Sequence, residues 1–106
     1  MTRRHAEEAL RITREYGFRV VEGQALTVLC RAAEAEPAHP AAVGLGREAP
    51  AVHRGTGHRL GEARALLVLA RALRGTAGDA ELVRQQALEV FSEVGVPPEA
   101  SGDPDR

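Results

Sequence analysis

A duplication with a forty-residue period is the feature that most constrains the fold of this chain. Displacing the 106-residue sequence by forty residues aligns residues 8–32 with residues 48–72 without a gap, and 12 of the 25 aligned positions are identical. The identical pairs are Glu8/Glu48, Ala9/Ala49, Arg14/Arg54, Gly17/Gly57, Arg19/Arg59, Glu22/Glu62, Ala25/Ala65, Leu26/Leu66, Val28/Val68, Leu29/Leu69, Arg31/Arg71 and Ala32/Ala72. A repeat of this length is typical of proteins that stack two-helix units, because one unit alone cannot bury its apolar face.

Each copy predicts a helix, a glycine turn and a second helix. The first helical face is formed by Ala6, Ala9, Leu10, Thr13 and Tyr16. Gly17 follows where a helix commonly ends in the left-handed conformation, and a second helix over residues 20–36 ends before Pro37. In the second copy Gly57 marks the turn, and residues 60–74 form a helix that is apolar on nearly all sides. We expect this helix to be the most buried element.

Three further segments complete the predicted fold. Residues 80–94 carry a single apolar stripe and end at Gly95, which predicts a fifth helix. The helix that the repeat predicts before the second glycine turn is interrupted by Pro40, Gly44, Gly46 and Pro50. We therefore expect only an irregular or short helix at about 38–55. The prediction is an all-α fold of about five antiparallel helices, stacked as hairpins over residues 1–96, followed by a disordered tail at residues 97–106.

The composition excludes several classes of protein. The net charge of −1 provides no global field for DNA or an acidic membrane, and three aromatic residues are too few for a base-stacking platform. The only cysteine is Cys30, so no intramolecular disulfide can form. The N-terminus does not resemble a signal peptide, and no apolar run approaches the length of a membrane span. We expect a cytoplasmic protein without membrane contact.

No group of residues in the sequence predicts catalysis, a metal ion or a cofactor. His53 and His58 straddle a glycine turn at a spacing that fits no metal motif, and we expect all four histidines at the surface or in turns. The glycine-rich stretch at residues 55–61 lacks both the preceding strand and the lysine of a phosphate-binding loop. Cys30 is expected to be a small core residue rather than a nucleophile.

The second copy and the end of the chain resemble a known repeat family. The segments that carry the likeness are TGHRLGEARAL at 56–66, LARAL at 69–73 and ALEVFSEVGVP at 87–97. They resemble the tetratricopeptide repeats at the C-terminal end of actinobacterial transcriptional regulators, of the antibiotic-regulatory-protein type and related large NTPase regulators. The last unit is shorter than a standard repeat, and neither a winged helix nor a nucleotide-binding motif is present. The resemblance implies a tetratricopeptide-like (TPR-like) α-α superhelix, with Ala70 and Cys30 as the small residues where helices approach.

The resemblance also implies a peptide-binding surface on the inner face of the first helix of each repeat. In the frame of that family, the first helix is the one that follows the glycine turn. On the helix at residues 60–74 this face would carry Arg64, Leu67, Arg71 and Arg74. On the helix at residues 20–36 it would carry Gln24, Thr27, Arg31 and Glu34. Arg31, Arg64 and Arg71 would bind the carboxylates of an acidic peptide through forked hydrogen bonds. The alternative interpretation is a solvated helix face with ordinary charges.

These observations favour a non-enzymatic TPR-type module that binds a protein or peptide, within or derived from a bacterial transcriptional regulator. We expect nucleic acid to be contacted only indirectly. About three units are usually needed for stability and this chain has two and a half, so we expect self-association to cover the end helices and form a homo-oligomer. Two alternatives stay open: a small helical DNA-binding regulator, and a truncated repeat fragment without independent function.

Overall fold

Five α-helices follow one another along the chain in the computed structural model. They are α1 (Arg3–Tyr16), α2 (Arg19–Ala35), α4 (Ala49–Gly55), α5 (Arg59–Ala72) and α6 (Ala80–Glu93). The structure describes residues 3–35, 43–44, 46–74, 80–97 and 100–102. None of these residues lies in a β-strand, which confirms the predicted all-α class.

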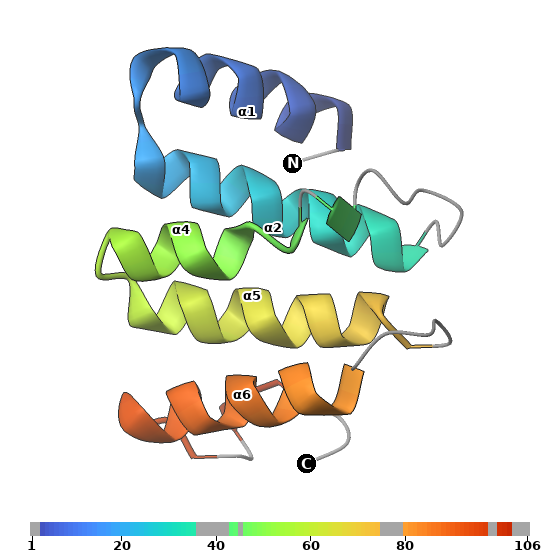
Figure 1. The fold of residues 1–106 in the computed structure, drawn as a ribbon, viewed down its shortest axis with the longest axis vertical. Coiled ribbons are helices and arrows are strands. Elements are labelled where there is room, and N and C mark those ends of the chain that lie inside the picture. Colours follow the sequence, from blue (N-terminus) through green and yellow to red (C-terminus); the bar gives the residue numbers. More distant parts are fainter. Residues whose placement is uncertain (1–2, 36–42, 45, 75–79, 98–99, 103–106) are drawn as a thin grey trace.

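The helices are stacked side by side with alternating direction, so that each consecutive pair is antiparallel (Figure 1). The helix α1 packs against α2, α2 against α4, α4 against α5, and α5 against α6. Beyond these neighbours, α2 also contacts α5, and the two run in the same direction. The forty-residue repeat therefore places equivalent residues of α2 and α5 on two parallel helices.

The limits of the helices agree with the sequence prediction within two residues for α2, α5 and α6. The predicted irregular segment contains the seven-residue helix α4. Pro50 lies in the first turn of α4, where a proline costs no helical hydrogen bond because the first amides have no partner within the helix. Proline therefore shortens this helix without removing it.

The two glycine turns have the same backbone geometry. Gly17 and Gly57 both have a φ of 75°, in the left-handed region that residues with a Cβ rarely adopt. After Gly17, the Phe18 amide donates to the carbonyl of Thr13 at 2.9 Å; after Gly57, the His58 amide donates to the carbonyl of His53 at 2.9 Å. Both turns thus end a helix with a Schellman motif, as the sequence predicts.

A buried glutamate lies beside each turn and is held by two arginines. Glu62 has a fully buried side chain, and its two carboxylate oxygens accept from Arg54 Nε at 2.9 Å and from Arg59 Nη1 at 2.6 Å. In the first copy, Glu22 accepts from Arg14 Nε at 3.3 Å and from Arg19 Nη1 at 3.0 Å. All six residues belong to identical pairs of the repeat. The duplication therefore preserves an ion-pair cluster that ties the end of one helix to the start of the next.

The apolar core is divided into two clusters, one for each half of the stack. The first joins α1, α2 and α4 through Ala6, Leu10, Ala25, Leu26, Leu29, Ala49 and Val52, together with Ala65 of α5. The second joins α5 and α6 and includes Cys30. Cys30 is fully buried, as predicted, and a Cβ added to Gly46 would lie 2.5 Å from its Cβ. This contact leaves no room for a side chain at residue 46.

The Tyr16 side chain is more exposed than helical spacing predicts. Helical spacing places Tyr16 on one face with Ala6, Ala9, Leu10 and Thr13, but its side chain is 65% exposed and stacks on Phe18 with ring centroids 6.1 Å apart. Five of the seven large exposed hydrophobic residues lie on α1, at the start of α2 or in the turn between them: Ile12, Tyr16, Phe18, Val20 and Val21. The tail predicted to be disordered lies partly outside the described residues. Within it, Ser101 is buried and the carbonyl of Gly102 accepts a hydrogen bond from Arg71.

Replacing either turn glycine should destabilise the protein. We expect Gly17→Ala and Gly57→Ala each to lower the free energy of unfolding by about 1–2 kcal/mol, the cost of the left-handed conformation for an L-residue. Gly55→Ala is the matched control, since Gly55 lies in α4 with open space around it and should be neutral or stabilising. Urea unfolding measures all three, and equal effects at Gly55 and Gly57 would contradict the role of φ.

The buried glutamate should be costly to leave unpaired. We expect the double variant Arg54→Ala/Arg59→Ala to lose about 3–5 kcal/mol of stability, because the Glu62 carboxylate would then be buried without a counterion. Arg11→Ala removes an arginine that pairs with Glu8 and Glu15 on the exposed surface of α1, and it should leave stability unchanged. If the melting temperature of the double variant falls no further than that of the Arg11→Ala control, the arginine–glutamate cluster does not stabilise the fold.

Candidate functional site

A pocket between the parallel helices α2 and α5 brings together several of the predicted binding residues. We call it the α2–α5 pocket. It is lined by Gln24, Thr27, Val28, Arg31, His53, His58, Gly61 and Arg64, and its volume is about 210 Å³. The residues from α2 follow the spacing i, i+3, i+4 and i+7, which places them on one helical face. The short helix α4 and its turn supply the two histidines that close one end.

The residues that line this pocket differ between the two copies of the repeat. Six of the eight differ from their equivalents forty residues away; only Val28 and Arg31 are matched, by Val68 and Arg71. In contrast, every member of the two arginine–glutamate clusters is matched. The positions that fix the turns are therefore shared, whereas those that line the pocket have diverged.

Two arginines of the α2–α5 pocket have no acidic partner. Six of the twelve arginines with described side chains form ion pairs with glutamates: Arg11, Arg14, Arg19, Arg54, Arg59 and Arg84. Within the described part of the chain, Arg31 and Arg64 form neither an ion pair nor a side-chain hydrogen bond, and both are exposed. Their guanidinium groups are thus available to an external carboxylate, which they can bind through two parallel hydrogen bonds.

His53 forms part of the pocket floor and is only 3% exposed, so the expectation that all histidines lie at the surface or in turns is wrong for this residue. The Thr27 hydroxyl donates to the Gly23 carbonyl at 2.9 Å, and its oxygen lies 3.3 Å from His53 Nε2. This arrangement favours a proton on Nε2. The Nδ1 atoms of His53 and His58 are buried, with no hydrogen-bond partner among the described atoms.

Two glycines make room for the His53 ring. A Cβ on Gly23 of α2 would lie 2.9 Å from the ring, and a Cβ on Gly61 of α5 would lie 2.6 Å from Nδ1 of both His53 and His58. The rings of His53 and His58 meet edge to face, with centroids 5.1 Å apart. The imidazole is therefore enclosed by two helix backbones, which explains its burial.

The environment of His53 disfavours its charged form. Burial lowers the pKa of His53 below its usual value, and the nearby His58 lowers it further. The Gly23 carbonyl and the Glu62 carboxylate act in the opposite direction but do not compensate. At neutral pH this imidazole is neutral and can serve as a hydrogen-bonding group of the pocket.

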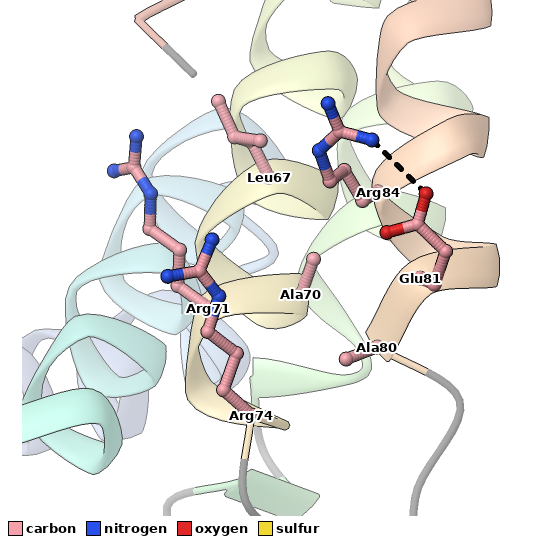
Figure 2. Close-up of a pocket in the computed structure, with 7 residues that line it drawn as sticks. All are labelled: Leu67, Ala70, Arg71, Arg74, Ala80, Glu81 and Arg84. Carbon is pink, nitrogen blue, oxygen red and sulfur yellow. Dashed lines mark hydrogen bonds and ion pairs between the residues drawn. The ribbon is translucent and has the colours of Figure 1, made fainter. Parts of the chain in front are cut away.

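A second pocket lies between α5 and α6, and we call it the α5–α6 pocket (Figure 2). It is lined by Leu67, Ala70, Arg71, Arg74, Ala80, Glu81 and Arg84, with a volume of about 180 Å³. Its floor is apolar, and Arg84 pairs with Glu81 of the same helix at 3.0 Å. This pocket repeats one wall of the first, because Leu67 and Arg71 are the equivalents of Thr27 and Arg31.

The seven residues predicted for peptide binding are divided between these two pockets. Gln24, Thr27, Arg31 and Arg64 line the α2–α5 pocket, while Leu67, Arg71 and Arg74 line the α5–α6 pocket. The side chain of Glu34 lies outside the described residues. Sequence reasoning missed the other four residues of the α2–α5 pocket: Val28, His53, His58 and Gly61. His53, His58 and Gly61 differ from their repeat equivalents Thr13, Phe18 and Val21, and this difference is the signal in the sequence that could have identified them.

The described residues include no group of three or more potential metal ligands, and no described helix is long and apolar enough to cross a membrane. Comparisons of the chain with protein-family models, curated proteins and solved structures give no match. The proposed function is therefore argued from the geometry of the two pockets and from the sequence resemblance.

Protonation of His53 should destabilise the fold. The folded chain holds His53 at a pKa below the value of about 6.5 expected when unfolded, so the unfolded chain binds more protons as the pH falls. This contribution to stability is complete above pH 6.5 and is lost as the pH falls toward the folded pKa. We expect the urea midpoint to drop between pH 7.5 and pH 5, and to drop less in His53→Gln. His5→Gln on exposed α1 is the control, and identical pH dependence in both variants would contradict the assignment.

Proposed function

We propose that this chain is a non-enzymatic, TPR-like helical-repeat module that binds an acidic segment of another protein in the α2–α5 pocket. The observation that carries the proposal is the pair of exposed arginines without acidic partners, Arg31 and Arg64, on two parallel helices at the rim of one pocket. Forked hydrogen bonds from two guanidinium groups favour a carboxylate ligand over a neutral one.

The divergence between the copies supports a binding role for this pocket. A surface with only a structural role would share the constraints of its repeat equivalent, as the turn clusters do. At the α2–α5 pocket, six of eight lining residues differ from their equivalents, and they combine hydroxyl, amide, imidazole and guanidinium groups. Such a mixture of a few polar groups around a small cavity is typical of sites that fix the orientation of a ligand.

The wider role follows from the sequence resemblance. We propose that the module acts in the cytoplasm as part of, or derived from, a bacterial transcriptional regulator, and that it contacts nucleic acid only through its partner. The exposed apolar residues at the turn between α1 and α2 are the surface through which copies would associate into a homo-oligomer. The net charge of −1 and the ion pairing of six of the twelve described arginines with glutamates argue against the alternative of direct DNA binding.

Fluorescence anisotropy with labelled peptides tests the proposal. We expect an Asp/Glu-rich peptide to bind more tightly than its Asn/Gln counterpart, and Arg31→Ala/Arg64→Ala to weaken binding at least tenfold, since a charge-assisted hydrogen bond contributes about 1.5–3 kcal/mol. Arg11→Ala, on the exposed surface of α1, shows the effect of removing one positive charge outside the pocket.

Three results would contradict this function. They are equal binding of the acidic and neutral peptides, equal losses in the Arg31/Arg64 double variant and the Arg11 control, and tighter binding of duplex DNA than of acidic peptide. The last result would support the DNA-binding alternative instead.

A further inference from the structure

The two pockets share the helix α5 as a common wall. Gly61 and Arg64 face the α2–α5 pocket from the first half of α5, and Leu67, Ala70 and Arg71 face the α5–α6 pocket from the second half. Because Arg64, Leu67 and Arg71 are spaced i, i+3 and i+7, they lie on one face of the helix. An extended ligand can therefore contact both pockets while following α5.

The two pockets are related by the repeat, but the equivalent residues Thr27 and Leu67 give them different chemistry. Thr27 of α2 offers a hydroxyl to the first pocket, whereas its equivalent Leu67 offers an aliphatic side chain to the second. Beside Leu67 lie Ala70 and Ala80, so the floor of the second pocket is formed by apolar side chains from both α5 and α6 (Figure 2).

The arginines of the second pocket are engaged within the chain, unlike those of the first. Arg84 pairs with Glu81, and Arg71 donates to the carbonyl of Gly102. Arg74 also interacts with other groups of the chain. In the α2–α5 pocket, Arg31 and Arg64 have no such partner among the described residues. The first pocket therefore offers cations to a ligand, and the second offers mainly apolar surface.

We infer that the two pockets together recognise a pair of side chains in one extended peptide: a carboxylate at the α2–α5 pocket and an aliphatic side chain at the α5–α6 pocket. This inference rests on the proposed function and adds a second determinant to it. Charge complementarity selects the first side chain, and burial against Leu67, Ala70 and Ala80 selects the second.

The helix geometry sets the distance between the two side chains. The α5 residues that line the first pocket, Gly61 and Arg64, and those that line the second, Leu67, Ala70 and Arg71, are centred about seven residues apart, which corresponds to about 10 Å of helical rise. An extended peptide covers about 3.3 Å per residue, so the carboxylate and the aliphatic side chain should be about three residues apart. The order Asp-x-x-Leu or Leu-x-x-Asp reports the direction in which the peptide follows α5.

Titration of the full chain with synthetic peptides, followed by NMR chemical shifts, tests this arrangement. The probes are capped Gly/Ser hexapeptides that carry one Asp and one Leu at separations of one to five residues, in both orders. We expect the best affinity at a separation of three in one order, and a loss of roughly tenfold when Leu is replaced by Gly, the effect of burying one aliphatic side chain.

Variants assign each determinant to its pocket. Leu67→Thr, which installs the residue of the equivalent position, should abolish the preference for Leu and keep the dependence on Asp. Since Leu67 is buried and its variant could lose stability, Ala80→Met, which fills the same pocket from α6, serves as a second test and should also abolish the preference for Leu. Arg31→Ala/Arg64→Ala should remove the dependence on Asp alone.

The outcomes separate this inference from the proposed function. Peptides that bind through Asp with no effect of Leu or of its separation would overturn the two-pocket arrangement and leave the acidic-peptide function intact. A preference for Leu that survives both Leu67→Thr and Ala80→Met would also overturn it. Failure of every peptide to bind at millimolar concentration would overturn both proposals together.

Discussion

A carboxylate removed from water and held between two arginines is the interaction on which this architecture depends. Glu22 and Glu62 each lie beside a glycine turn, and each carboxylate oxygen accepts from a different arginine. One arginine comes from the helix before the turn and the other from the first turn of the helix that follows. The cluster therefore fixes the angle between two helices at their junction. Stacking of the hairpins follows, because α2 and α5 then leave their turns in the same direction.

The sequence predicts much of this fold because the strongest local signals agree with the tertiary structure. The left-handed conformation of Gly17 and Gly57 and the limits of α2, α5 and α6 follow from glycine punctuation and helical periodicity. Burial was harder to predict where it depends on neighbours. Tyr16 lies at helical spacing with core residues, but its side chain is exposed and stacks on Phe18 instead of entering the core. His53 is buried because glycines on two other helices leave space for its ring, and periodicity within one helix contains no such information.

The candidate site could be predicted only in part, for the same reason. Helical spacing places Arg64, Leu67 and Arg71 on one face, and the structure agrees with that geometry. Their division between two pockets depends on where α4 and α6 pack, which spacing along α5 does not specify. The residue type also does not indicate which arginines have an acidic partner, since arginine is bound to glutamate at the turns and unpaired at the pocket rim. Comparison of the two copies distinguishes Arg64, which replaces Gln24, from the turn arginines, but not Arg31, which is matched by Arg71.

The parallel direction of α2 and α5 affects whether a ligand binds in one position or in two equivalent positions along the stack. Two hairpins related by translation present the same backbone polarity twice, so a ligand that contacted only shared features could shift by one unit and bind equally well in either place. Arg31 and Arg71 alone would permit such slippage, since they are equivalent. Thr27 and Leu67 exchange a hydroxyl for an aliphatic side chain, and His53 and His58 line only the α2–α5 pocket, so the two registers are unequal. Divergence of a few side chains thus converts a repetitive scaffold into one with a single preferred alignment.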